Sequence, residues 1–261
     1  MIGLELLRVL RQATTVTGLT LRYLLGTRRV IPTALLGAVP FILTLALAAG
    51  NVENFDIVLF QILLVPLFLQ VVLIFVTLVS ATTLIREEIE DNTLPYLLTR
   101  PISKPAIVSY KYLGYLAAVL ILLIPPLVLA YVVTDLYAGD SFTADLDVLG
   151  AFIIATILGS AAYGALFLFL SVVVRKPLAA GLLFGFVWES IVGSIPGDVR
   201  LLSIIHYLKS ILKDLIAVGP VTFYESTVSA EIAFAVLIGI AVAMVVLSMV
   251  RLHGMEFRQK A

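Results

Sequence analysis

Charged side chains are concentrated in one short stretch of a sequence that is otherwise strongly apolar. The first part of this stretch holds Arg86 and the carboxylates Glu87, Glu88, Glu90 and Asp91. Carboxylates near the start of a helix are stabilised by the helix dipole, which makes Glu90 and Asp91 suitable neighbours for a new helix. This concentration of charge between two apolar segments makes the connection a candidate functional site.

The residues that follow predict a short helix. Asn92 can take the left-handed conformation that ends a helix, Thr93 can cap a new one, and Pro95 suits a first turn. We expect this helix over residues 94–99, and a solvated loop with little helix is the alternative. Its apolar side chains would fit a groove on a partner protein: Leu94, Tyr96, Leu97 and Leu98. Arg100 follows them and is a further candidate contact.

A second candidate site surrounds an acidic residue in an apolar segment. Gly181, Gly185, Glu189 and Gly193 recur every four residues, and Trp188 precedes the glutamate. A carboxylate inside a membrane usually faces protein or water, and small residues at this spacing let helices approach closely. We expect this face to contact another helix, a dimer partner or the translocation path. A structural, hydrogen-bonded carboxyl beside an interfacial tryptophan is the alternative.

The sequence gives little support for a metal site or a catalytic site. The two histidines, His206 and His253, fall on opposite sides of the predicted membrane and cannot form one metal site. Cysteine is absent, which excludes disulfides and thiolate metal sites. The sequence has no supporting pattern of a nucleophile and a base, so an intramembrane protease is not indicated.

Long apolar segments must position these residues. The chain has 261 residues, of which 61% are hydrophobic and 13% charged, and its mean hydropathy is +1.13. Soluble domains carry about 25% charged residues, and a helix of about 20 apolar residues crosses a bilayer. We expect an all-α polytopic membrane protein, a single transmembrane domain over 1–261 with six transmembrane helices at 30–49, 57–85, 106–133, 148–174, 178–196 and 229–250. Pro125 and Pro126 should kink or unwind the third.

Two further elements are expected outside these spans. Residues 2–25 alternate polar and apolar positions at helical spacing, which predicts an amphipathic helix in the membrane interface. Residues 197–228 hold a segment, 199–218, that is long enough to span but is interrupted by Lys209, Lys213 and Asp214. We expect an external element that is either re-entrant or lies on the surface.

The distribution of basic residues predicts the orientation. Fourteen of the 17 Lys and Arg residues lie in the N-terminus, the connections after the second and fourth spans, and the C-terminus. Lys and Arg favour the cytoplasmic side. Both termini should therefore be cytoplasmic in a multi-pass protein of the cell membrane.

The charged stretch resembles a known family signature. Residues 85–94 read IREEIEDNTL and residues 97–104 read LLTRPISK. This resembles ABC transporter type-2 permeases, or type V exporters, in which a run E-x-E-x-G-T and then L-L-x-x-P-x-S-[RK] follows the second of six spans. The resemblance extends over the chain. Asn92 replaces the usual glycine, and Pro95 stands where the family more often has another residue, which leaves the boundaries of the helix open.

The resemblance implies a function and a set of partners. Residues 86–105 would form the cytoplasmic coupling region that docks into an ABC-type ATP-binding subunit. Two such subunits would serve a permease dimer, either of two identical copies or of two different chains. The chain lacks G-x-x-x-x-G-K-[ST], so ATP and Mg²⁺ would be bound by the partner subunit and no cofactor by this chain.

Two alternative functions remain open from the sequence. One is an ion-coupled secondary transporter that uses Glu189 as its proton carrier. The other is an ATP-driven mechanotransmitter that acts on an extracytoplasmic partner. The lipid bilayer is a partner in every case, and no nucleic acid is expected. The scarcity of charge within the spans favours hydrophobic or amphipathic cargo for an exporter.

Overall fold

The computed structural model describes residues 2–28, 30–50, 52, 55–90, 103–139, 145–195, 197–226 and 228–254. Of residues 2–10, 86–90, 104 and 253 it describes the backbone alone. Within these ranges every regular element is a helix. The prediction of an all-α polytopic membrane protein is confirmed.

Four long apolar helices form the body of the bundle. They have the length and composition needed to cross a membrane and cover four of the predicted spans: Ile57–Ile85, Pro105–Ala138, Leu146–Val173 and Ala230–Leu252. The first of these four spans consists of three consecutive segments: α4 (Ile57–Leu64), the π-helical segment η1 (Val65–Val72) and α5 (Leu73–Glu90). Each of the other three is a single helix: α7 (Lys104–Ala138), α8 (Leu146–Val173) and α12 (Ala230–His253).

Prolines shape two of these elements in different ways. Pro66 lies at the start of η1, where the wider π-helical turns accommodate a residue that has no N–H to donate. By contrast, α7 remains helical through Pro125 and Pro126, so the third span is not unwound there, and the kink expected as the other possibility stays a prediction. α7 packs against α1, α3, α8 and α12, and neighbouring helices are one means by which a membrane helix tolerates an internal proline.

The first predicted span is divided into two helices. α2 (Val30–Gly37) and α3 (Val39–Ala49) meet at an angle of 44°. Pro40 is the second residue of α3 and cannot donate to the carbonyl four residues earlier, which explains a break at this point. Together the pair is long and apolar enough to count as a fifth span.

The predicted fifth span is a shorter helix. α9 (Pro177–Leu182), η2 (Leu183–Trp188) and α10 (Glu189–Val192) form one apolar run, Pro177–Val192. This run is below the length of about 20 residues that usually crosses a bilayer. The count of six spans therefore stays a prediction.

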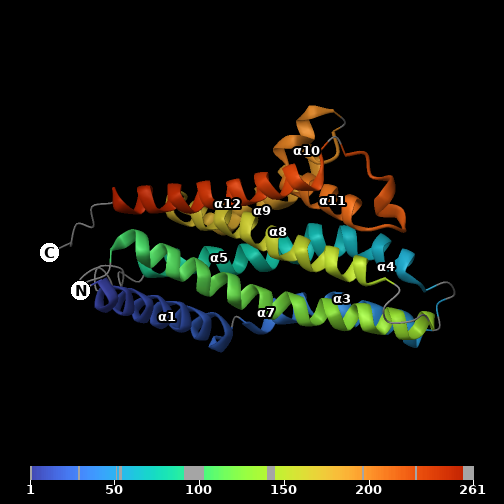
Figure 1. The fold of residues 1–261 in the computed structure, drawn as a ribbon, viewed down its shortest axis with the longest axis horizontal. Coiled ribbons are helices and arrows are strands. Elements are labelled where there is room, and N and C mark those ends of the chain that lie inside the picture. The colour runs from blue at the N-terminus through green and yellow to red at the C-terminus, as the bar shows by residue number, and fades with distance from the viewer. Residues whose placement is uncertain are drawn as a thin grey trace.

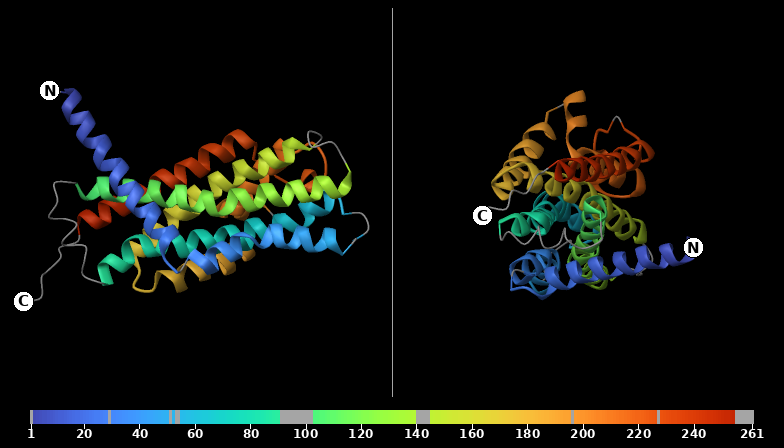
Figure 2. Two further views of the ribbon diagram at one scale, coloured as in Figure 1. Left: turned by 90° about the horizontal axis from the view of Figure 1, so that it is seen from below. Right: turned by 90° about the vertical axis from the view of Figure 1, so that its left-hand side faces the viewer.

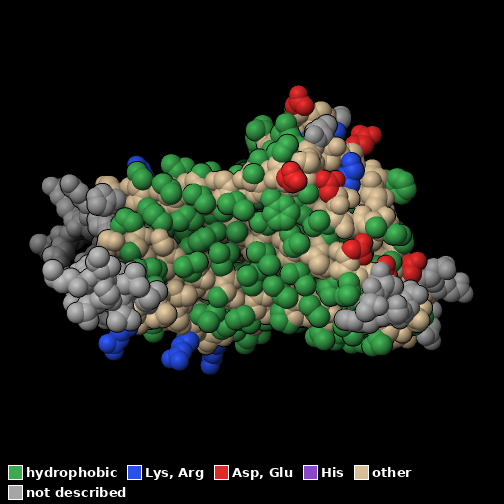
Figure 3. Space-filling view, viewed as in Figure 1, with side chains coloured by type: hydrophobic (Ala, Val, Ile, Leu, Met, Phe, Trp, Pro, Cys, Tyr) green, Lys and Arg blue, Asp and Glu red, His purple; other side chains and the backbone are tan. Residues whose placement is uncertain are grey.

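The bundle has two distinct ends, as Figures 1 and 2 show. α1 (Ile2–Gly26) begins and α12 finishes at one end, which we call the terminal end; α5 finishes and α7 begins there as well. α3 and α7 finish at the opposite end, and α4 and α8 begin there. In Figure 3, basic side chains gather along α1 near the terminal end, and acidic side chains gather toward the opposite end.

α8 is the central helix. It packs against α5, α7, α11 and α12, and most of its residues are buried. Two glycines permit this packing, because a side chain at Gly159 would collide with Leu73, and one at Gly164 would collide with the ring of Tyr115. The core therefore depends on close helix approach at small residues.

The segment before α12 packs into the bundle. It contains η3 (Asp198–Leu202), α11 (Ile204–Leu215) and η4 (Pro220–Phe223). α11 packs against α8 and α12 toward the opposite end, and eight of its twelve residues are buried. The helix predicted within residues 199–218 is thus present, and its position relative to the membrane stays a prediction.

Candidate functional site

The start of the predicted coupling region continues a long helix. α5 extends through Glu90, so the backbones of Glu87, Glu88 and Glu90 are helical beyond the apolar part of the span. The remaining residues predicted for partner contact lie outside the described residues: Asp91, Asn92, Thr93, Leu94, Leu97, Leu98 and Arg100. The structure thus describes the two helices between which the predicted coupling helix would lie.

A buried lysine ties these two helices together. Lys111 of α7 is 7% exposed, and its Nζ donates a hydrogen bond of 2.9 Å to the backbone carbonyl of Leu84 in α5. A hydrogen bond from a charged donor contributes about 1.5–3 kcal/mol. Sequence reasoning assigned Lys111 to the cytoplasmic side by its charge but did not predict this contact. The bond holds the end of α5 beside the start of α7.

α1 is fastened to the same part of α7. The hydroxyl of Thr17 donates to the carbonyl of Tyr110 at 3.1 Å. One turn further along, a side chain at Gly114 would lie 2.8 Å from the carbonyl oxygen of Thr17 and 2.8 Å from Cβ of Thr20. The two backbones therefore cross in direct contact. α1, α7 and the end of α5 form a connected unit at the terminal end.

The small-residue face of the predicted fifth span is buried within the chain. A side chain at Gly181 would collide with Leu78, and one at Gly185 would collide with Ile74, both on α5. These contacts are intrachain, so both glycines pack against another helix of the same chain. The role of this face at a dimer partner or a translocation path stays a prediction. Trp188 is 43% exposed and donates from Nε1 to the carbonyl of Leu202 at 3.3 Å.

Glu189 caps the start of α11. The carboxylate is 3% exposed and accepts hydrogen bonds from the backbone N–H of Ile204 at 3.0 Å and of Ile205 at 3.2 Å. The hydroxyl of Ser203 donates to the same carboxylate. The first N–H groups of a helix have no partner within it, and a carboxylate both satisfies them and interacts favourably with the helix dipole. Gly193 contributes by leaving room for Ser203 and Ile205.

A polar cluster surrounds Tyr224 on the other side of α11. His206 is fully buried, and its Nδ1 lies 2.7 Å from the hydroxyl of Tyr224. The ammonium of Lys209 lies 5.6 Å from the centre of the same ring, within the range of a cation–π contact. Nearby, the guanidinium of Arg200 donates to the carbonyl of Glu225. The cluster joins η3, α11 and the segment after η4.

The environment of His206 differs from that of a typical histidine on an amphipathic helix. A single histidine on an amphipathic helix is expected on the polar face, but this imidazole is buried, and its Nε2 has no hydrogen-bond partner among the described residues. Burial lowers the pKa of His206 from its ordinary value of 6.5, and the positive charges of Arg200 and Lys209 lower it further. Neutral imidazole is therefore the favoured form in the fold.

These features describe a bundle whose polar side chains serve to join helices at both ends. Comparison with known proteins adds a family assignment. A sequence profile described as ABC-2 family transporter protein matches residues 36–257, which is most of the chain. No curated protein sequence matches this chain.

Proposed function

Because this chain belongs to the ABC-2 family of transporter proteins, we propose that it is the membrane-embedded permease subunit of an ABC exporter. The family match is the observation that carries the proposal. The long apolar helices are consistent with it, since they provide a membrane-embedded body.

In the proposed assembly, two copies of this chain bind two ATP-binding subunits. Those subunits bind ATP and Mg²⁺ and hydrolyse ATP. Each docks on residues 86–105, and its movement reaches the membrane through α5 and α7. The hydrogen bond between Lys111 and Leu84 supports this route, because it joins the two helices next to the docking segment.

We further propose six spans in the cell membrane with both termini in the cytoplasm. The bent pair α2–α3 is the first span, and the run from α9 to α10 is the short fifth. Two observations support this topology. Successive long helices run in alternating directions between the two ends of the bundle, and the basic side chains gather near the terminal end.

Residues 197–228 form an outer gate or a docking surface for an extracytoplasmic partner in this proposal. The segment presents large apolar side chains at its surface, including Phe223 at 86% exposure and Leu202 at 64%. An ATP-driven mechanotransmitter would use the same scaffold and the same ATP-binding subunits. The difference between the two functions lies in whether a solute crosses the membrane.

An ion-coupled transporter that carries protons on Glu189 is the weaker alternative. The carboxylate already accepts two backbone N–H groups and one hydroxyl at the start of α11. Protonation would weaken all three bonds and remove the favourable interaction with the helix dipole. This arrangement favours a structural role for Glu189.

The test is a detergent pull-down of the chain from its native membrane, with co-purifying subunits identified by mass and ATPase activity measured on the eluate. We expect an ABC-type ATPase to co-purify with the wild-type chain. Glu90→Lys should release it, and Thr93→Ala should uncouple ATP hydrolysis from transport without unfolding the spans.

Glu231→Lys is the matched control. It is the same charge reversal at an exposed position in the first turn of α12, at the opposite end of the bundle. Retention of the ATPase by this control and its loss from Glu90→Lys would support the coupling region. An oligomer without an ATPase would overturn the proposal and bring Glu189 back as the residue to test.

A further inference from the structure

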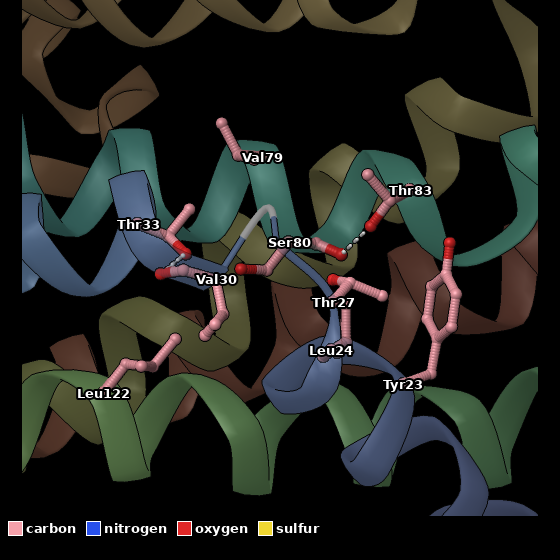
Figure 4. A pocket seen from close by; sticks show the side chains of 9 residues that line it. All are labelled: Tyr23, Leu24, Thr27, Val30, Thr33, Val79, Ser80, Thr83 and Leu122. Carbon is pink, nitrogen blue, oxygen red and sulfur yellow. Dashed lines mark hydrogen bonds between the residues drawn. The ribbon is translucent and has the colours of Figure 1, made fainter.

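A small pocket opens where α1 gives way to α2, and hydroxyl groups line it. Figure 4 shows the side chains around it, which come from α1, α2, α5 and α7 and from the α1–α2 junction. The hydroxyl-bearing ones are Tyr23, Thr27, Thr33, Ser80 and Thr83. The cavity volume is ≈ 20 Å³, which is the space of about one water molecule. The cavity can admit a single polar group, but it is too small for the whole headgroup of a lipid.

The hydroxyls of this pocket differ in what they can still donate. Thr33 donates to the carbonyl of Val30 at 2.9 Å, and Thr83 donates to the carbonyl of Ser80 at 3.0 Å; both bonds are drawn in Figure 4. The hydroxyl of Ser80 has no hydrogen bond within the part of the chain that the structure describes, although Ser80 is 7% exposed. Thr27 likewise makes no side-chain hydrogen bond there. The hydroxyls of Ser80 and Thr27 thus line one pocket, and both remain able to donate a hydrogen bond.

A hydroxyl that faces a pocket and makes no hydrogen bond to the protein can donate to a group that enters from outside, so this pocket is suited to a hydrogen-bond acceptor. No charged side chain lines it, which disfavours an anion within it. A neutral carbonyl oxygen has the required size, polarity and two acceptor lone pairs. Ser80 of α5 and Thr27 of the α1–α2 junction both line the pocket, so both can donate to such an oxygen.

The surface around the pocket has both apolar and basic side chains, which match the acyl chains and the phosphate of a lipid. Ile31 and Leu35, on α2 beyond the pocket, are 65% and 63% exposed. Arg22 in α1 and Arg28 at the α1–α2 junction, which precede α2 in the chain, are also exposed. Basic side chains favour the headgroup level of an anionic membrane, and apolar ones favour the acyl chains. The hydroxyl pocket lies between them, where a phospholipid carries its ester groups.

We propose that this pocket binds the ester region of one membrane phospholipid. The ester carbonyl accepts hydrogen bonds from Ser80 and Thr27, the phosphate lies near Arg22 and Arg28, and an acyl chain follows Ile31 and Leu35. This lipid site is independent of ATP coupling, so its test does not depend on the proposed transport function.

The experiment is native mass spectrometry of the full chain, with its co-purified subunits, from nanodiscs that contain either diacyl phosphatidylglycerol or its diether analogue. The diether lipid has the same headgroup and chains but no carbonyl oxygens. We expect the wild-type chain to retain the diacyl lipid about 25-fold more than the diether lipid, the effect of two hydrogen bonds of about 1 kcal/mol each. Ser80→Ala should lower this preference to about five-fold.

Thr82→Ala is the matched control, because Thr82 lies on the same helix, bonds to the carbonyl of Leu78 at 2.7 Å and does not line the pocket. It should keep the preference for the diacyl lipid. Thr27→Val provides a second test from the other side of the pocket if Ser80→Ala fails to fold. Equal retention of both lipids by the wild-type chain would overturn the proposal and leave a pocket that holds only water.

Discussion

The carboxylate of Glu189 in α10 accepts a hydrogen bond of 3.0 Å from the backbone N–H of Ile204, the first residue of α11. This bond joins the run from α9 to α10 to the helix that packs between α8 and α12. The acidic residue that stood out in the sequence thus serves to place one helix against another.

Removal of this cap should loosen α11. In Glu189→Ala, the N–H groups of Ile204 and Ile205 lose their acceptor in a buried site, so the free energy of unfolding should fall by about 2 kcal/mol. Thermal unfolding in micelles, followed by the fluorescence of Trp188, the only tryptophan, would measure this change. Glu189→Gln should lose less, because its amide oxygen can still accept. Ser190→Ala, at an exposed neighbouring position, should have no effect.

The crossing of α1 over α7 should not tolerate a methyl group. In Gly114→Ala, the new Cβ would lie 2.8 Å from a backbone oxygen that cannot rotate away, so α1 must shift. We expect a loss of about 1–3 kcal/mol in stability. Gly150→Ala in α8 is the control, because nothing lies within 4 Å of its added Cβ. It should raise the unfolding temperature through better helix propensity. A similar effect of both substitutions would argue against direct backbone contact at Gly114.

The buried imidazole of His206 should make stability depend on pH. Its pKa is lowered in the fold, first by burial and then by Arg200 and Lys209, whereas the unfolded chain retains a value near 6.5. The unfolded state therefore binds the proton more readily, and the stability present above pH 6.5 is lost as the pH falls through the lowered pKa.

Unfolding temperatures measured across this pH range would test the effect. His206→Gln should flatten the dependence, while His253→Gln, a change at the only other histidine, should leave the wild-type slope in place. An unchanged slope in His206→Gln would assign the titration to another group.

Loss of the lysine at the start of α7 should free the end of α5. Lys111→Met removes the donor to the carbonyl of Leu84, so backbone amides of residues 86–90 should exchange with deuterium roughly ten-fold faster. Lys176→Met removes an exposed positive charge and should leave this exchange unchanged. Faster exchange in both variants would indicate a general effect of charge.

The long helices could be predicted from the sequence because apolar length alone decides them. The span predicted at residues 57–85 has the bounds found for the candidate span in the structure, Ile57–Ile85. Breaks were harder to place, since Pro40 divides a helix while Pro125 and Pro126 do not. The same residue type gives different results because packing against neighbouring helices decides whether a missing hydrogen bond ends a helix.

The partners of individual polar residues could not be predicted in the same way. Glu189 was identified from its charge in an apolar segment, but its contacts with Ser203, Ile204 and Ile205 depend on how the chain turns back after α10. Lys111 gave no local signal at all, because its acceptor is a backbone carbonyl 27 residues away in the chain. Such contacts arise from tertiary structure and leave no spacing pattern.

The separation of basic and acidic side chains along the bundle also makes the folded chain an electric dipole. A voltage across a membrane acts on each elementary charge with about 2.3 kcal/mol per 100 mV. In an energised membrane whose interior is negative, the orientation with the terminal end inside is favoured by this voltage, and inversion would carry many charges against it. In the proposed orientation, with both termini in the cytoplasm, the membrane voltage would thus act on the same charges that direct insertion and would oppose inversion for as long as the membrane remains polarised.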